Sequence, residues 1–219
     1  MEIFWGSGSG PAWRVLLAAE IKKVPYTSRL LSFTSGEHKT REMLLMNPRG
    51  KVPVLREGTF SLYESVAILA YLDAKYPEPS LFGKTPEEIG TTWRTVLELE
   101  HYAGPAMGKV SRPILFRQLA EKEAEVKEGR AHMHDELRKL EALLEGHTWF
   151  GGAHVSAADL VAFPFVMTLL RAADRPEAQP LDLGIHPFER HYPRLATWKA
   201  YMEAIPGYER TYPPHWREV

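Results

Sequence analysis

The chain has 219 residues, of which 44% are hydrophobic and 25% are charged. This is ordinary globular composition, and it excludes a largely disordered or fibrous chain. Its 27 basic and 28 acidic residues give a net charge of -1, so the basic excess typical of nucleic-acid-binding proteins is missing, and its lack of cysteine excludes disulfides, zinc–thiolate sites and cysteine nucleophiles. No apolar run has the length of a membrane span, and the N-terminus lacks the pattern of a signal peptide. We therefore expect a cytoplasmic protein that binds neither nucleic acid nor a membrane.

The first eighty residues alternate between short strand patterns and helix patterns. In chain order we predict a strand at 2–5, a helix at 11–21, a strand at 26–33, a short helix at 41–46, a hairpin of 52–55 and 60–63, and a helix at 64–75. The order β-α-β-α-β-β-α predicts a small sheet with helices packed on it, which we assign to a domain at 1–80.

The remainder of the chain contains helical patterns and no clear strand. The predicted helices lie at 87–101, 110–119, 121–144, 156–170 and 193–204, after a linker at 82–86, and they predict an all-helical domain at 87–219. Ser156 and Asp159 have the spacing of a capping box, which is a folding signal. His132 and His134 are two residues apart, so a helix points them to different sides, and we expect surface histidines and no metal site.

The segment Gly6-Ser7-Gly8-Ser9-Gly10 forms a loop between the first strand and the first helix. Such a loop presents backbone N–H groups and the positive end of the helix dipole to whatever is bound there. Ser9 lies at the expected N-cap, where its hydroxyl either caps the helix or donates a hydrogen bond to an anion. No Gly-Lys-Ser/Thr follows, so this is not a nucleotide phosphate loop.

Two further features have both a structural and a functional interpretation. Pro53 interrupts a strand, which indicates either a plain edge strand or a cis bond that leaves the Val52 backbone free to pair with an extended peptide. Glu64 and Ser65 begin a strong helix. They form either a simple cap or a site in which Glu64 binds an ammonium group and the first helical turn binds a carboxylate, as an α-amino acid would require.

These features, in this order and spacing, resemble the cytosolic glutathione S-transferase superfamily, and its serine-type classes (zeta, tau and phi-like) in particular. The runs that carry the resemblance are NPRGKVPVL at 47–55, LYESVAILAYL at 62–72 and VSAADL at 155–160. The resemblance implies an α/β thioredoxin-like domain followed by an all-α helical bundle, usually in a homodimer. It also implies glutathione as co-substrate, no metal, and a detoxifying reaction with a hydrophobic electrophile.

The resemblance also assigns a set of glutathione-binding positions: His38, Lys51, Val52, Pro53, Glu64 and Ser65. The backbone before the proline would pair with the cysteinyl part of glutathione. The glutamate and serine would hold the γ-glutamyl amino and carboxylate groups. The histidine and lysine would contact the glycine carboxylate.

Ser9 is the implied catalytic residue, because Ser9 to Val15 resembles the Ser-x-x-x-x-Arg-Val pattern of the serine-type classes, and Ser7 is a competing candidate. Lowering a thiol pKa from about 8.5 to about 6.5 takes roughly 2.7 kcal/mol. A hydrogen bond to a charged group supplies about 1.5–3 kcal/mol and a helix N-terminus about 0.3–1 kcal/mol, so no metal is needed. Arg14 either adds positive potential or forms a salt bridge on the first helix.

The electrophile pocket is the least determined part of the sequence. Its candidate residues are Trp13, Tyr102, Met107 and Phe116, which serve equally as core residues, and the C-terminal run 213–216 can close over it. Two alternatives remain open at this point: a non-catalytic binding or scaffold protein of the same fold, and a specialised glutathione-dependent lyase, isomerase, dehalogenase or peroxidase.

Overall fold

A computed structural model describes residues 1–217, which form two compact units. The first unit comprises Met1–Phe82 together with the chain from Glu203 onward, and the second comprises Gly83–Met202. The chain from Glu203 onward therefore packs with the N-terminal residues. The assignment of 87–219 to one electrophile-binding domain stays a prediction, because compactness does not test what each part binds.

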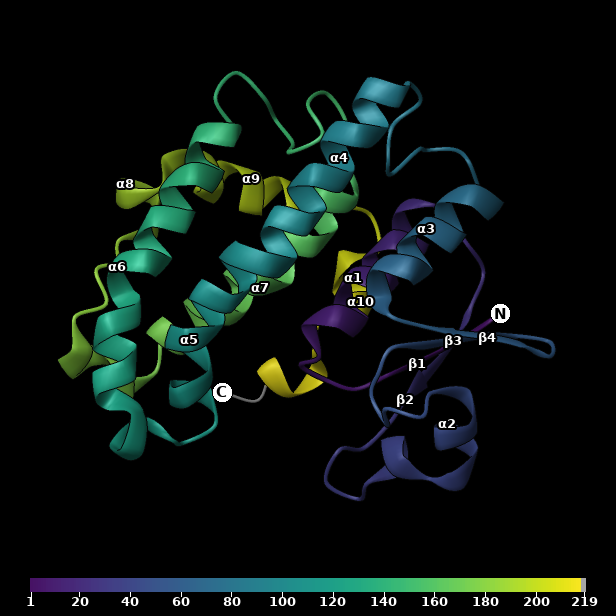
Figure 1. Cartoon of the computed structure of the whole chain (residues 1–219), viewed down its shortest axis with the longest axis horizontal. Helices are drawn as coiled ribbons and strands as arrows, with labels where there is room; N and C mark the ends of the chain where they lie inside the picture. Colours follow the sequence, from purple (N-terminus) through teal and green to yellow (C-terminus); the bar gives the residue numbers. More distant parts are fainter. Residues whose placement is uncertain (218–219) are drawn as a thin grey trace. The chain divides into compact units, whose positions relative to one another are not determined.

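The first unit is built on a mixed β-sheet (Figure 1). Its strands are β1 (Glu2–Trp5), β2 (Thr27–Leu30), β3 (Val54–Glu57) and β4 (Phe60–Tyr63). They are ordered β2-β1-β3-β4, with β2 parallel to β1 and the other neighbours antiparallel. This is the expected thioredoxin-like sheet. Strand β2 is shorter than the predicted 26–33, because β1 ends at Trp5, whose carbonyl accepts the last bond, from the Leu31 N–H at 2.8 Å.

The register of the sheet brings three chain segments to one end of it. Phe4, near the end of β1, lies opposite Val54 at the start of β3, and Val54 lies opposite Tyr63 at the end of β4. Antiparallel neighbours run in opposite directions, so the segment after β1, the segment before β3 and the segment after β4 all leave the sheet at this end.

Helices cover both faces of the sheet. Those of the first unit are α1 (Gly10–Ile21), η1 (Glu37–Lys39), α2 (Arg41–Met46), α3 (Ser65–Lys75), α10 (Tyr208–Thr211) and η4 (Pro214–Trp216). Phe4 and Val54 cluster with Met43 of α2 on one face. Ile3 and Leu55 point to the other face by strand alternation and are fully buried, on the side that α1 and α3 cover in Figure 1.

A buried ion pair fixes the chain where α3 ends. The Lys22 ammonium, whose side chain is fully buried, lies 2.7 Å from Asp73 Oδ1 and donates to the carbonyl oxygens of Tyr76 and Pro79 at 2.6 and 2.7 Å. Asp73 also accepts the Leu81 N–H at 2.7 Å. Each charge is therefore paired and hydrogen-bonded, as burial requires.

The second unit is helical, as predicted. Its elements are α4 (Pro86–Glu98), the π-helical turn η2 (Leu99–Ala103), α5 (Gly104–Leu115), α6 (Leu119–Leu143), α7 (Ala157–Ala173), η3 (Pro176–Leu181), α8 (Phe188–His191) and α9 (Pro193–Glu203). The predicted helices did not include residues 102–109, but the structure is helical there. Pro105 is tolerated because it lies in the first turn of α5, next to the π turn. No helix of residues 1–217 combines the length and apolar character needed to cross a membrane.

The start of α7 is a closed hydrogen-bond network around Asp159, which is fully buried. Asp159 Oδ2 accepts the Ser156 N–H at 2.7 Å and its hydroxyl at 2.8 Å, which is the predicted capping box. Asp159 Oδ1 accepts the Phe150 N–H and the Trp198 indole N–H, both at 2.9 Å. Burial raises the pKa of Asp159, and the four hydrogen bonds oppose that rise.

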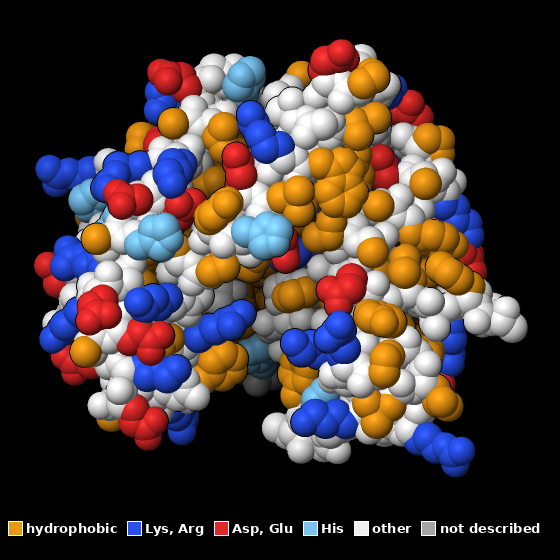
Figure 2. All heavy atoms as spheres, viewed as in Figure 1, with side chains coloured by type: hydrophobic (Ala, Val, Ile, Leu, Met, Phe, Trp, Pro, Cys, Tyr) orange, Lys and Arg blue, Asp and Glu red, His pale blue; other side chains and the backbone are white. Residues whose placement is uncertain are grey.

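The surface of α6 carries interspersed charges of both signs (Figure 2). The expectation of two surface histidines on this helix is wrong for His134. Its Nε2 lies 2.8 Å from the Leu183 carbonyl and its Nδ1 contacts the Tyr192 hydroxyl. Because a carbonyl only accepts, Nε2 carries the proton and Nδ1 accepts from tyrosine. His132 is exposed, as expected.

Candidate functional site

Ser9 lies between β1 and α1 with its hydroxyl proton uncommitted. The residue is the N-cap of α1, its backbone is extended (φ -76°, ψ 105°), and its Oγ accepts the Ala12 N–H at 3.3 Å. Its own N–H donates to the Gly6 carbonyl at 3.0 Å. Within residues 1–217 the hydroxyl has no acceptor for its proton, so the half-buried group caps the helix and can still donate to an anion.

Ser7, the competing candidate, is engaged by the C-terminal segment. Its Oγ lies 2.6 Å from His215 Nδ1 and 3.4 Å from the His215 backbone N–H. When Nδ1 is the acceptor, the imidazole takes the only proton that Ser7 can donate. This arrangement favours Ser9 as the free donor.

The Val52–Pro53 peptide bond is cis, as the sequence allowed, and lies just before β3. Pro53 is buried and Val52 is half-buried. Backbone hydrogen bonds outside the helices and strands of residues 1–217 include none from or to Val52, so its polar groups can pair with an extended ligand. The register described above puts this residue at the same end of the sheet as the loop that carries Ser9.

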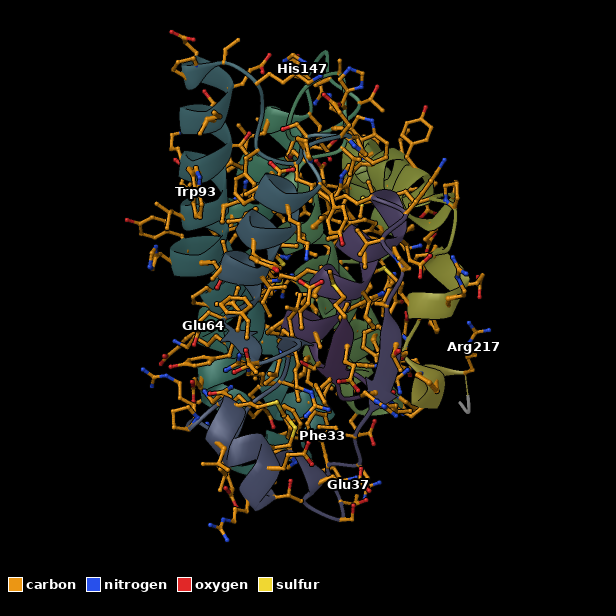
Figure 3. The ribbon with its side chains drawn as sticks, turned by 90° about the vertical axis from the view of Figure 1, so that its right-hand side faces the viewer. Phe33, Glu37, Glu64, Trp93, His147 and Arg217 are labelled. Atoms are coloured by element: carbon orange, nitrogen blue, oxygen red, sulfur yellow. The ribbon has the colours of Figure 1, made fainter. Side chains whose placement is uncertain are left out.

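Glu64 and Ser65 follow β4 and complete the same end of the sheet. Glu64 has a positive φ of 69°, a strained conformation for a residue with a side chain, and its exposed carboxylate makes no cap hydrogen bond (Figure 3). Ser65 is the first residue of α3 and is buried. Its Oγ accepts from Nη1 of the buried Arg14 at 3.3 Å. Arg14 thus lies beneath Ser65 and leaves that hydroxyl a proton to donate.

His38 and Lys51 belong to the segments flanking α2. His38 is half-buried in η1, with its ring edge-on to Phe33 at a centroid distance of 5.1 Å. Its Nδ1 is buried and has no hydrogen-bond partner among the described residues. Lys51 is exposed, and its carbonyl accepts from Asn47 Nδ2 at 2.8 Å.

The four candidate electrophile-pocket residues are divided between the units. Trp13, in the first unit, and Met107, in α5, are almost fully buried, as core residues are. Tyr102 and Phe116 are 59% and 69% exposed. Tyr102 lines an open cavity of about 550 Å³ beside α4 and α6, together with Glu136 and Lys139. That these four side chains share one pocket stays a prediction.

Asn47 and Arg49 contact the segments that carry the candidate site, and the sequence reasoning missed them. Asn47 is buried, its Oδ1 accepts the Arg49 N–H at 3.0 Å, and it holds the carbonyl of Lys51, so it orders the turn that leads to Val52. The Arg49 guanidinium lies 3.9 Å from the Glu64 carboxylate. The signal was present as an asparagine before a proline in a turn, where asparagine side chains often bond the following backbone.

Comparison with known proteins identifies the family of the chain. Family models for the glutathione S-transferase N-terminal and C-terminal domains match residues 7–80 and 123–199. Glutathione S-transferase A of Pleuronectes platessa is 30% identical, covering 100% of this chain and 93% of the relative. Human glutathione S-transferase theta-2B is 31% identical, covering 95% of this chain and 83% of the relative. The crystal structure of a glutathione S-transferase from the Antarctic clam Laternula elliptica superposes with a TM-score of 0.81 and 28% identity, covering 100% of this chain and 94% of that one. The chain therefore belongs to the glutathione S-transferase family of enzymes.

Proposed function

We propose that this enzyme transfers glutathione to a hydrophobic electrophile, and that the Ser9 hydroxyl stabilises the glutathione thiolate. The observation that carries the proposal is the uncommitted proton of Ser9 at the N-terminus of α1. The Ser9 hydroxyl accepts the Ala12 N–H with one lone pair and keeps its own proton to donate to a ligand. A hydrogen bond to an ionised acceptor such as a thiolate is stronger than a hydrogen bond to a neutral acceptor.

The tripeptide would be bound by groups at the shared end of the sheet. The Val52 backbone supplies a donor and an acceptor for the cysteinyl residue. Ser65, at the N-terminus of α3 and above the Arg14 guanidinium, suits the γ-glutamyl carboxylate, and the Glu64 carboxylate suits the ammonium group. Two more groups, the His38 imidazole and the Lys51 ammonium, would contact the glycine carboxylate.

In the reaction, the bound thiol releases its proton to solvent and the sulfur lone pair forms a bond to an electrophilic carbon. A leaving group then departs with the electron pair, or the adjacent double bond takes it up and is protonated. Ser9 donates to the sulfur throughout and exchanges no proton. Its hydrogen bond and the dipole of α1 together can supply the roughly 2.7 kcal/mol needed to bring the thiol pKa to about 6.5.

The electrophile, the assembly and the location follow as parts of the same proposal. Trp13, Tyr102, Met107 and Phe116 are the apolar residues proposed to contact the electrophile, which we take to be a hydrophobic small molecule. We propose that the protein is a cytoplasmic homodimer, which sedimentation of the purified enzyme would test by its mass.

The experiment compares wild type, Ser9→Ala and the control Ser61→Ala, which removes a hydroxyl from β4 of the same unit. Glutathione binding is measured by calorimetry, and conjugation to a generic electrophile is measured across pH. We expect near-equal binding in all three proteins, and an apparent thiol pKa of about 8 in Ser9→Ala against about 6.5 in the other two. At pH 6.5 the conjugation rate of Ser9→Ala should fall about ten-fold or more.

Two results would count against the proposal. A wild-type pH profile in Ser9→Ala would remove Ser9 from the chemistry and return the role to Ser7 or Arg14. Failure of the wild-type protein to bind glutathione would favour a scaffold that has kept the fold alone.

A further inference from the structure

The C-terminal segment, defined here as residues 208–217, is attached along the whole length of α1. Its attachments include the ion pair of Arg210 with Glu20, the hydrogen bond from Trp13 Nε1 to Thr211 Oγ1 at 2.9 Å, the edge contact of Trp216 with Trp13 at a centroid distance of 5.3 Å, and the hydrogen bond between His215 and Ser7 at 2.6 Å. They run from the last turn of α1 to the loop that precedes it. Arg217 closes the segment and donates to Glu209 (Figure 3).

At the loop the fit is close. Gly8 has a φ of 81°, and a Cβ added there would lie 2.6 Å from His215 Cε1 and 3.5 Å from Trp216 Nε1. The imidazole therefore lies directly on the Gly8 backbone, one residue before Ser9. A side chain at position 8 is excluded both by its backbone conformation and by this contact.

A second aromatic ring contacts the loop at Gly6. A Cβ at Gly6 would lie 2.2 Å from the Phe33 ring, which itself packs edge-on against His38. Phe33 projects from the segment after β2 (Figure 3). The loop from Gly6 to Ser9 is thus contacted by Phe33 at Gly6 and by His215 at Gly8, and the bond from the Ser9 N–H to the Gly6 carbonyl closes it into a turn.

We propose that His215 is a positioning residue for the thiol site, which acts through Ser7 to hold the loop in the conformation that directs the Ser9 hydroxyl at the sulfur. This inference rests on the proposed role of Ser9 and adds to it a contribution from the far end of the chain. When Nδ1 of the neutral imidazole carries no proton, it accepts from the Ser7 hydroxyl. Ser7 then holds the loop in place, and the Ser9 hydroxyl keeps its proton for a ligand. Small displacements of a reacting group change rates strongly. Loss of the Ser7–His215 hydrogen bond should therefore lower the rate of the chemical step more than it lowers the affinity for glutathione.

The test measures kcat, KM for glutathione and the apparent thiol pKa in His215→Ala, Ser7→Ala and their double variant. We expect His215→Ala to lower kcat at pH 6.5 about three- to ten-fold with KM changed less than about two-fold. The apparent thiol pKa should rise, though less than in Ser9→Ala. Because both residues act through one hydrogen bond, the double variant should be no worse than the more impaired single variant.

Two further variants separate positioning from a general loss of structure. In His215→Asn the amide oxygen can accept the Ser7 proton, so kcat and the pH profile should recover towards wild type. The control His147→Ala removes an exposed histidine from the loop after α6 and should be indistinguishable from wild type. If His215→Asn were as impaired as His215→Ala, or if the losses of the single variants simply multiplied, action through Ser7 would be ruled out.

Ser9→Ala measured in parallel distinguishes failure of this inference from failure of the proposed function. A raised thiol pKa in Ser9→Ala together with a wild-type profile in His215→Ala would overturn only the role of His215. A wild-type profile in both variants would overturn the role of Ser9 and the inference with it.

Discussion

Ser9 and Ser156 both lie at the N-cap of a helix, and the difference between them is what their hydroxyl protons do. Ser156 donates to Asp159 at 2.8 Å inside a network in which each carboxylate oxygen accepts two hydrogen bonds, and it is buried. Ser9 is half-buried, accepts a single hydrogen bond at 3.3 Å and keeps its proton. The same residue type at the same helical position is thus a folding element in one unit and a candidate catalytic group in the other. Unused hydrogen-bonding capacity distinguishes the two.

The largest effect is expected from removing Asp159, the acceptor of the hydrogen-bond network that contains Ser156. Asp159→Ala leaves four donors without their acceptor, three of them buried, and we expect it to lower the free energy of unfolding by about 4 kcal/mol. Denaturant titration measures the loss, with the exposed Asp135→Ala as control. Activity per folded molecule should be unchanged. A loss below about 1 kcal/mol would mean that the network contributes little to the fold.

The first unit also contains a buried group whose hydrogen bonds are complete, the ion pair of Lys22 with Asp73. Removing it tests whether a structural role depends on complete hydrogen bonding or on the unit in which the group lies. Asp73→Ala would leave the Lys22 ammonium buried without its counter-ion, and we expect a loss of about 3 kcal/mol in unfolding experiments. The exposed pair of Asp174 and His186 provides the control, since Asp174→Ala should cost less than about 0.5 kcal/mol. Equal losses in the two variants would contradict the assignment of the Lys22 pair as structural.

The two duties of Ser9 can be separated by one pair of variants. Ser9→Ala should cost about 1 kcal/mol of stability through the lost cap. Aspartate caps a helix as well as serine does but cannot donate, so Ser9→Asp should regain that stability while its apparent thiol pKa stays at least as high as in Ser9→Ala. Thermal unfolding and the pH profile of conjugation measure the two effects. An active Ser9→Asp enzyme would show that donation by Ser9 is not required.

The smallest expected effect concerns His134, another satisfied group. Burial lowers its pKa below the ordinary value of 6.5, so the unfolded chain binds this proton more readily than the folded one. Stability from this residue is complete above about pH 6.5 and declines as the pH falls towards the lowered pKa of the folded state. His134→Gln should flatten that part of the pH dependence of unfolding, whereas His132→Gln, on the exposed side of α6, should leave it unchanged.

The sequence predicted the fold well, because strand alternation, helix caps and turn residues are local signals. The structure confirms the predicted helix at Arg41–Met46, strand at Phe60–Tyr63 and capping box at Ser156. The continuous helix through 102–109 was missed, because glycine and proline in this segment are residues that usually end a helix. In the structure the π-helical turn precedes them, and the proline lies in the first turn of α5, where it is tolerated.

The candidate site was predictable in its residue types and less so in its organisation. Spacing pointed to Ser9, Val52 and Glu64, but only the register of β1, β3 and β4 brings the chain segments that carry them to one end of the sheet. The burial of Arg14 beneath Ser65 and the contact of His215 with Ser7 join residues 51 and 208 positions apart. No local sequence pattern predicts such pairs, because the two residues are far apart in the chain and only tertiary packing brings their side chains together.

The close fit of His215 and Trp216 against Gly8 has a practical consequence for handling the protein. Arg217 lies one residue beyond the tryptophan, so a bulky group attached to this residue would lie close to the loop that carries Ser9. Chemical labels are therefore better kept off residues 215–217. Kinetic constants measured on a protein labelled there would report the label as well as the enzyme.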